Sequence, residues 1–285
     1  MPQVRLGCEP EGRGPGCSAP VTLRNPLSSE QRSLRPTTLI ELLRAVRRNQ
    51  SVGQAEIALC ELGRVWPGTF DDEGVPIEER RLGIVLAGAW QPRQWHSAVA
   101  PFDIYDLVGV LEDLRDVLGI GSYAQTATEH PSLMPGQALA ITCAGSHAGV
   151  AGALHPEIAR AFDIDTEVFV AELSFDALVQ ATSGGVGYQP PPRFPAVERD
   201  LAVVVGVDVL VGDLVDTAKR FGAPLLSEVA VFDVYRGGGI PAGKKSVALG
   251  LHYRDPDKTL TDLEVDDVHA AVERALADAH GAVRR

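Results

Sequence analysis

The stretch VYRGGGIPAGKKS, residues 234–246, decides how the last third of the chain folds. Two glycines and a lysine match most of the G-x-x-x-x-G-K-[ST] pattern of nucleotide-binding loops, but Lys245 stands where a hydroxyl should hold magnesium. Such a loop must lead into a helix, whose first N–H groups bind the phosphates. Residues 247–253 instead carry an apolar side chain at every second position, which is the period of a strand. The loop is therefore predicted to join two strands of a hairpin and not to bind a nucleotide.

The segments around this hairpin predict one compact unit. They are, in order, a strand, a helix, the two hairpin strands, a helix and a short strand, at residues 201–205, 209–221, 225–235, 246–254, 259–281 and 282–285. Thr261 and Glu264 form a capping box at the start of the second helix. The order β-α-β-β-α-β predicts a ferredoxin-like fold.

The chain before this region also mixes helices and strands. Helices are predicted at 37–49, 102–118 and 156–162, and strands at 55–66, 80–90 and 167–173. The inward-facing residues are predicted to be Leu39, Leu42, Leu43 and Val46 in the first helix and Ile104, Val108, Leu111 and Leu118 in the second. The fold class is therefore α+β throughout.

Composition divides the chain into domains and limits its environment. Residues 1–22 are rich in Gly and Pro and are expected to be irregular, 23–187 form a first domain, 188–193 a proline-rich linker and 194–285 a second domain. No apolar run is long enough to cross a membrane, and the start lacks the order of a signal peptide, so a cytoplasmic protein is expected. Cys8, Cys17, Cys60 and Cys143 fit no common zinc spacing and are interpreted as reduced thiols.

A net charge of −12 argues against indiscriminate binding to nucleic acid or anionic lipid. It does not exclude a local basic site, because screening makes nearby charges matter more than distant ones.

Four blocks of the second domain occur together in a known family. The blocks FPAVERDLAVVV, FDVY, GKKS and KTLTDLEV, in this order, closely resemble the C-terminal anticodon-binding domain of bacterial phenylalanine–tRNA ligase beta subunits. Upstream, NPLSSEQRSLRPTTLIELLRAVRRN, ELGRVW and HPSLMPGQALAI resemble the class II synthetase-like core domain of the same subunit. The resemblance runs from about residue 23 to the end. The family's editing and OB modules have no counterpart here, so the chain is expected to be a C-terminal portion or a truncated product.

The first domain lacks the arginines that a class II synthetase site needs for ATP and the activated carboxylate. Pro67-Gly68-Thr69 follow GRVW where an arginine is required, and Arg193 is the first arginine after the glycines of the last motif. We expect no catalytic residue, no metal site and no bound cofactor in this chain. The resemblance implies that ATP and Mg²⁺ act on the alpha subunit.

Three sets of isolated residues have both a structural and a functional interpretation. Arg64 is either an ATP clamp or a strand-end arginine paired with a carboxylate. His130 and His155 each precede a proline and are interpreted as turn-fixing donors and not as general bases. Arg199 and Asp200 either anchor the linker or contact RNA.

An RNA site is predicted on the hairpin. Asp233 and Tyr235 are two residues apart, so they share a face if the strand is regular. Tyr235 could stack a base, and Asp233 could accept hydrogen bonds from the N1–H and N2–H of a guanine. The resemblance implies contact between Asp233, Tyr235 and Ser246 and the first anticodon base, a guanine in tRNA for phenylalanine.

The charged loop beside these residues is predicted to bind the RNA backbone. Arg236, Lys244 and Lys245 are assigned to the phosphates, and the glycines at 237–239 would allow close approach. The alternative is that the tyrosine only covers the sheet and the loop is a solvated turn.

These expectations combine into one function with two alternatives. The chain is expected to be a beta-subunit component of phenylalanine–tRNA ligase, packing against a catalytic alpha subunit in a heterotetramer and binding tRNA for phenylalanine. The alternatives are a stand-alone RNA-binding or regulatory protein, or a fragment that cannot assemble.

Overall fold

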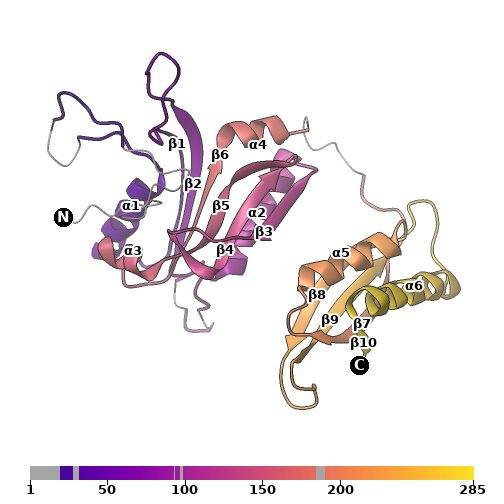
Figure 1. Ribbon diagram of the computed structural model, residues 1–285. Helices are drawn as coiled ribbons and strands as arrows, with labels where there is room; N and C mark the ends of the chain where they lie inside the picture. Colours follow the sequence, from indigo (N-terminus) through magenta and orange to yellow (C-terminus); the bar gives the residue numbers. More distant parts are fainter. Residues whose placement is uncertain (1–19, 28–31, 93, 97–98, 184–189) are drawn as a thin grey trace. The chain divides into compact units, whose positions relative to one another are not determined.

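The computed structural model describes residues 20–27, 32–92, 94–96, 99–183 and 190–285. The chain divides into two compact units, 1–187 and 188–285 (Figure 1). Most of the segment expected to be irregular (1–22), together with Cys8 and Cys17, lies outside the described residues. No described helix is long and apolar enough to cross a bilayer.

The first unit is built on a six-stranded antiparallel sheet. Its order is β1-β2-β6-β5-β4-β3, and the strands are β1 (Ile57–Val65), β2 (Glu79–Ala87), β3 (Tyr123–Ala127), β4 (Leu133–Cys143), β5 (Ser146–Leu154) and β6 (Val168–Ser174). Neighbours in the sheet are paired antiparallel throughout.

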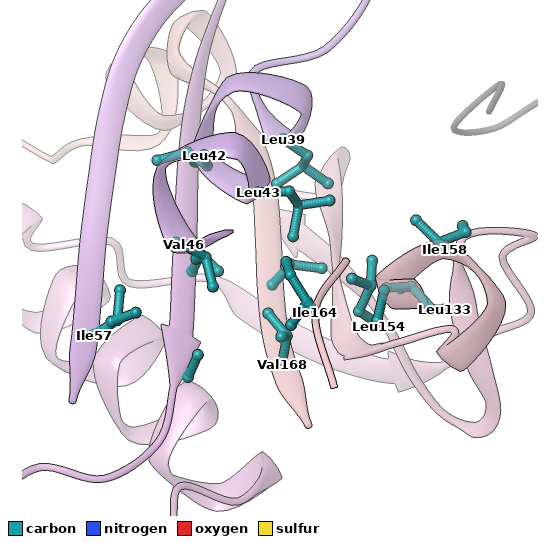
Figure 2. Packing of buried hydrophobic residues seen from close by; sticks show 14 of the residues in the cluster. Leu39, Leu42, Leu43, Val46, Ile57, Leu133, Leu154, Ile158, Ile164 and Val168 are labelled. Carbon is teal, nitrogen blue, oxygen red and sulfur yellow. The ribbon is translucent and has the colours of Figure 1, made fainter. Parts of the chain in front are cut away.

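Helices cover both faces of this sheet. Helices α1 (Leu39–Ser51) and α3 (Pro156–Ala161) pack on one face, and α2 (Ile104–Leu118) and α4 (Phe175–Ala181) pack on the other. Figure 2 shows the first of these two cores, in which Leu42, Leu43 and Val46 of α1 lie over the sheet. Central strands β2 and β6 supply alternate residues to both cores, which explains their unbroken apolar runs.

Most of the predicted elements of this unit are confirmed, with three differences. The apolar stripe of α2 runs through Ile104, Leu107, Leu111, Leu114 and Leu118, so the assignment of Val108 to the core was wrong by one position. Strand β3 and helix α4 were not predicted. The first is a short, largely exposed edge strand, and the second is a seven-residue helix that starts directly after β6 with Ser174 as its N-cap.

The two histidines that precede prolines fix turns, but as acceptors. Nδ1 of His130 accepts a hydrogen bond from the Ser132 N–H at 3.3 Å. Nδ1 of His155 accepts from the Glu157 N–H at 3.3 Å and caps α3. The prediction that they act as donors was wrong, because a helix or turn start offers free N–H groups.

A buried carboxylate joins three elements of the first unit. Glu172 of β6 is 9% exposed, and its Oε1 accepts hydrogen bonds from the Thr37 hydroxyl and from the N–H and hydroxyl of Thr38, each at 2.7 Å. Its Oε2 accepts from Nη1 of Arg81 at 2.8 Å. The start of α1, strand β2 and strand β6 are thereby held by one acidic group, with every partner a donor.

The second unit has the order β7 (Val197–Gly206), α5 (Val211–Gly222), β8 (Leu226–Tyr235), β9 (Lys244–Tyr253), α6 (Asp262–His280) and β10 (Val283–Arg284). The antiparallel sheet has the order β10-β7-β9-β8, so the predicted ferredoxin-like fold is confirmed. Strand β9 follows Gly243 directly, which confirms a hairpin in place of a nucleotide-binding loop. The capping box of Thr261 and Glu264 is also confirmed.

Both helices of this unit pack on the same face of its sheet. Leu214, Ala218, Val265, Val272 and Leu276 from α5 and α6 meet the odd-numbered residues of β7 and β9. Within the unit, no described helix covers the other face, which we call the open face. Even-numbered residues of β7 and β9 point to it.

A series of polar contacts on the helix side of the sheet links β9, α6 and β10. The buried Tyr253 hydroxyl contacts Nδ1 of His269 at 3.1 Å, and burial raises the pKa of Tyr253 to about 12. Glu273, next on the same helix face as His269, accepts from Nη1 of Arg284 at 2.8 Å. Because Arg284 faces the helices, the following residue, Arg285, faces the open side of the sheet.

We expect Glu172→Gln to lower the free energy of unfolding of the first unit by about 2 kcal/mol. The NH₂ group of the glutamine would face groups that donate hydrogen bonds to the carboxylate, so at least one hydrogen bond of the network would be lost. All three tryptophans lie in this unit, so urea unfolding followed by tryptophan fluorescence reports on it alone. The matched control is Glu167→Gln, an exposed carboxylate near the start of the same strand. Equal stability of the two variants would contradict a structural role for the Glu172 network.

Candidate nucleic-acid interface

Strands β8 and β9 bring the three predicted base-contact residues to the open face. Asp233 pairs with Ala248 and Tyr235 pairs with Ser246. The register is regular from Asp233 onward, because the one irregularity in this part of β8 falls between Val231 and Asp233. Asp233 and Tyr235 therefore point to the same side of the sheet, with Ser246 beside Tyr235 on the neighbouring strand.

The hydroxyl end of the Tyr235 side chain lies against the glycine loop. Its hydroxyl donates a long, 3.5 Å hydrogen bond to the carbonyl of Gly238. A Cβ at Gly237 would lie 2.6 Å from that hydroxyl oxygen, so a larger residue there would require the Tyr235 side chain to shift. The ring remains 40% exposed. A flat, partly exposed aromatic ring with few free torsions is the kind of surface on which an unpaired base stacks.

Arg285 lies next to this ring, and the sequence did not indicate it. Its N–H donates to the carbonyl of Ala202 on β7 at 2.9 Å, and its guanidinium carbon lies 5.7 Å from the centre of the Tyr235 ring. Because β7 and β9 lie between β10 and β8, the contact between the two side chains crosses the open face. Predicting this contact from the sequence would have required the register in which β10 pairs with β7.

Ser246 lies on this face but is covered. It is 3% exposed, and its neighbours across the two adjacent strands are Tyr235 and Val204. A base that contacts the Ser246 hydroxyl therefore has to displace one of the side chains above it.

The glycines of the loop between β8 and β9 have two different structural roles. Gly239 and Gly243 have φ values of 90° and 76°, a region that other residues rarely adopt. Gly238 has no atom within 4 Å of the place where a Cβ would be, so its backbone is open to an approaching ligand. Gly237, which was also predicted to allow close approach of RNA, instead leaves space for the Tyr235 hydroxyl.

The predicted phosphate-binding residues separate into two groups. Arg236 and Lys244 are exposed, and neither forms an ion pair with any residue that the structure describes. Lys245 shares the parity of Val247 and so faces the helix side; it is 5% exposed, and its Nζ donates to the Val207 carbonyl at 3.2 Å. Burial, with the nearby Arg236, lowers its pKa. The expectation that Lys245 is exposed for phosphate was therefore wrong, because the alternation of β9 turns it inward.

The open face is polarised along its strands. Lys244 and Arg285 lie at the end that carries the glycine loop, where Arg236 also follows β8, while Glu198, Asp200 and Glu228 lie toward the other end. Arg199 of β7 points to the helix side. It donates a hydrogen bond to Asp262 of α6 at 2.9 Å and so anchors β7 to the helix layer. A polyanion on this face is favoured only at the loop end.

The arginines on the sheet of the first unit are already paired within the chain. Arg64 of β1 lies 3.3 Å from Glu78, Arg80 of β2 pairs with Asp176, and Arg81 pairs with Glu79 and Glu172. A phosphate that binds one of these guanidiniums would compete with a carboxylate of the same chain. No group of three or more His, Cys, Asp or Glu side chains among the described residues could hold a metal ion.

Comparison with known proteins covers both units. Residues 14–175 match the family model "Phenylalanyl tRNA synthetase beta chain CLM domain", and residues 192–285 match "Ferredoxin-fold anticodon binding domain". The first match begins at residue 14, upstream of the expected start at 23.

Curated relatives match along most of this chain. The phenylalanine–tRNA ligase beta subunit of Symbiobacterium thermophilum is 37% identical over 90% of the chain and 29% of its own length. Those of Geobacillus kaustophilus and Bacillus subtilis are 37% and 36% identical over 93% of the chain and 33% of their own lengths. The chain thus spans about a third of the relatives that it matches, and it belongs to the family of phenylalanine–tRNA ligase beta subunits.

Proposed function

We propose that the second unit recognises the first anticodon base of tRNA for phenylalanine on its open face. The observation that carries the proposal is the placement of Asp233 and Tyr235 side by side on that face, beside a loop end that carries Arg236, Lys244 and Arg285. Tyr235 supplies the stacking surface, and the Asp233 carboxylate accepts from the Watson–Crick edge of guanine. The unpaired cations bind the backbone phosphates and supply affinity without base preference.

The roles within the site follow from chemistry and exposure. A guanine presents two adjacent donors, N1–H and N2–H, and a carboxylate is the side chain that accepts both at once. Adenine, which presents an acceptor at N1 and a donor at its 6-amino group, cannot pair with it in the same way. The Ser246 hydroxyl is the third contact with the base. It becomes accessible when the bound base displaces one of the neighbouring side chains, Tyr235 or Val204. Arg285 orients the Tyr235 ring before binding and adds charge at the same end.

We further propose that the first unit is a non-catalytic copy of the synthetase fold that packs against a catalytic alpha subunit. The pairing of Arg64, Arg80 and Arg81 with carboxylates supports this, because it leaves no free guanidinium on these strands for ATP. ATP and Mg²⁺ then act on the alpha subunit, in a cytoplasmic heterotetramer that charges tRNA. The relatives are named beta subunits, which implies such a partner.

The central test is binding of the chain to the anticodon stem-loop of phenylalanine tRNA, followed by fluorescence anisotropy at low salt. We expect preference for guanine over adenine at the first anticodon position, and its loss in Asp233→Asn. Tyr235→Leu lowers affinity for both stem-loops by about 5- to 150-fold, the range for loss of one stacked base. Asp216→Asn is the charge-matched control, because Asp216 is exposed on α5 over the opposite face.

A wild-type chain that binds both stem-loops equally, or an Asp233→Asn variant that keeps the preference, would contradict base recognition by this face. An equal loss of guanine preference in Asp216→Asn would show that the effect does not come from the carboxylate on the open face.

Neighbouring lysines give a second test with an internal control. We expect Lys244→Gln to lower the slope of log affinity against log salt by about 0.7, the value for one phosphate contact on a single strand. Lys245→Gln should leave the slope unchanged, because its ammonium is buried against the Val207 carbonyl. The salt series is run on both variants after circular dichroism has shown that each is folded. The reverse result would place Lys245 in the interface.

The partner proposal is tested by co-expression with a tagged alpha subunit from the same genome. We expect the chain to co-purify with it and to show no phenylalanine-dependent ATP–pyrophosphate exchange by itself. Arg64→Gln is expected to leave exchange by the co-purified complex unchanged, because Arg64 pairs with Glu78. Exchange activity of the isolated chain that is lost in Arg64→Gln would overturn the non-catalytic assignment.

A further inference from the structure

A β-bulge in β8 places an additional aromatic ring on the open face. Val231 pairs with Leu249 and Asp233 pairs with Ala248, so Phe232 is an extra residue with no partner of its own. In a regular strand Phe232 and Tyr235, three positions apart, would point to opposite faces. The extra residue removes this conflict, because both residues of a bulge face the same neighbour on the partner strand.

The position of the Phe232 ring confirms this geometry. Its Cδ1 atom lies 3.8 Å from the place where a Cβ of Gly250 would be, and Gly250 belongs to the open-face set of β9. Ala230, the strand partner of Gly250, contacts the same place. The ring therefore stands on the open side of the sheet, and it remains 60% exposed.

The residues of the open face around these rings have mostly small side chains. The open-face positions beside Phe232 and Asp233 are Ala202, Ala248, Gly250 and Ala230, all of which have small side chains or none, while Ser246 and Val204 lie beside Tyr235. Phe232 and Tyr235 rise from this floor on either side of the Asp233 carboxylate. A pair of exposed rings with one polar group between them matches successive unstacked bases of an RNA loop, each of which offers a flat face.

We propose that Phe232 is a second stacking platform, which holds the base of the nucleotide next to the one that stacks on Tyr235. The inference rests on the proposed function, and it deepens it from recognition of one base to capture of two. An RNA occupant is favoured over a protein because the adjoining loop end carries Arg236, Lys244 and Arg285, which attract phosphates. The bulge is then a device that converts one strand into a platform for two bases.

The test uses the full 285-residue chain and stem-loops that carry 2-aminopurine, whose fluorescence is quenched by stacking. The probe is placed in separate stem-loops at the second anticodon position and at the nucleotide before the first. We expect one of the two positions to be quenched on binding and released in Phe232→Leu and Phe232→Ala, with affinity lowered about 5-fold or more. Leucine keeps apolar cover over Gly250, so its effect reports the flat ring and not the packing.

The control for the same substitution is Phe221→Leu, since Phe221 is 48% exposed at the end of α5, on the helix layer. We expect it to change neither quenching nor affinity. Guanine preference that survives in a Phe232→Leu variant with lowered affinity would separate the two roles, because Asp233 and Tyr235 remain.

Three outcomes would overturn the inference. If the wild-type chain binds with guanine preference but neither probe position depends on Phe232, the ring is not a platform and the proposed function stands. If Phe232→Leu leaves RNA binding intact but abolishes co-purification with the alpha subunit, the ring is a protein contact. If the wild-type chain does not distinguish the stem-loops, the proposed function fails and this inference fails with it.

Discussion

The alternation of side chains along β9 is the constraint on which both the core and the candidate site of the second unit depend. Val247, Leu249, Leu251 and Tyr253 point to the helices and are fully buried, while the residues between them form the floor of the open face. One strand thus supplies both the core and the candidate binding surface. A shift of register by one residue would exchange the two sets, bury Lys244 and expose the core, so the hairpin cannot slip without loss of both fold and site.

The arginines on the sheet of the first unit and those near the glycine loop of the second unit differ in their partners. In the first unit the guanidiniums of Arg64, Arg80 and Arg81 are neutralised by carboxylates on neighbouring elements, and Glu172 fixes one of them from a buried position. In the second unit Arg236 and Arg285 form no ion pair with the described residues, and Arg285 contacts an aromatic ring instead. Charge satisfied inside the chain supports a scaffold, whereas charge left free is available to a polyanion. In the proposed function this contrast distinguishes the packing role of the first unit from the RNA-binding role of the second, despite the net charge of −12.

Periodicity predicted most of the fold, because buried faces impose it: the helix stripe of α1 and the alternation of β9 are both direct consequences of burial. It did not predict β3, whose residues are mostly exposed, or α4, which is too short to show a period. The placement of Asp233 and Tyr235 on one face followed from their spacing, while the structure shows that this is the open face. The inward position of Lys245 also follows from alternation, but three basic residues in a glycine loop suggested a common exposure that the strand does not allow. Phe232 and Arg285 could not be predicted, because a bulge and a long-range contact leave no local pattern.

The most direct test of this account is a map of the RNA-binding surface by backbone amide chemical shifts. The ¹⁵N-labelled chain is titrated with the anticodon stem-loop of phenylalanine tRNA, with a stem-loop of altered first anticodon base as the comparison. The account predicts guanine-dependent shifts in β8, β9, the loop between them and Arg285, with no such shifts on the outer surfaces of α5 and α6. Shifts that map to those helices or to the first unit, or that are the same for both stem-loops, would contradict the claim that the open face recognises the anticodon.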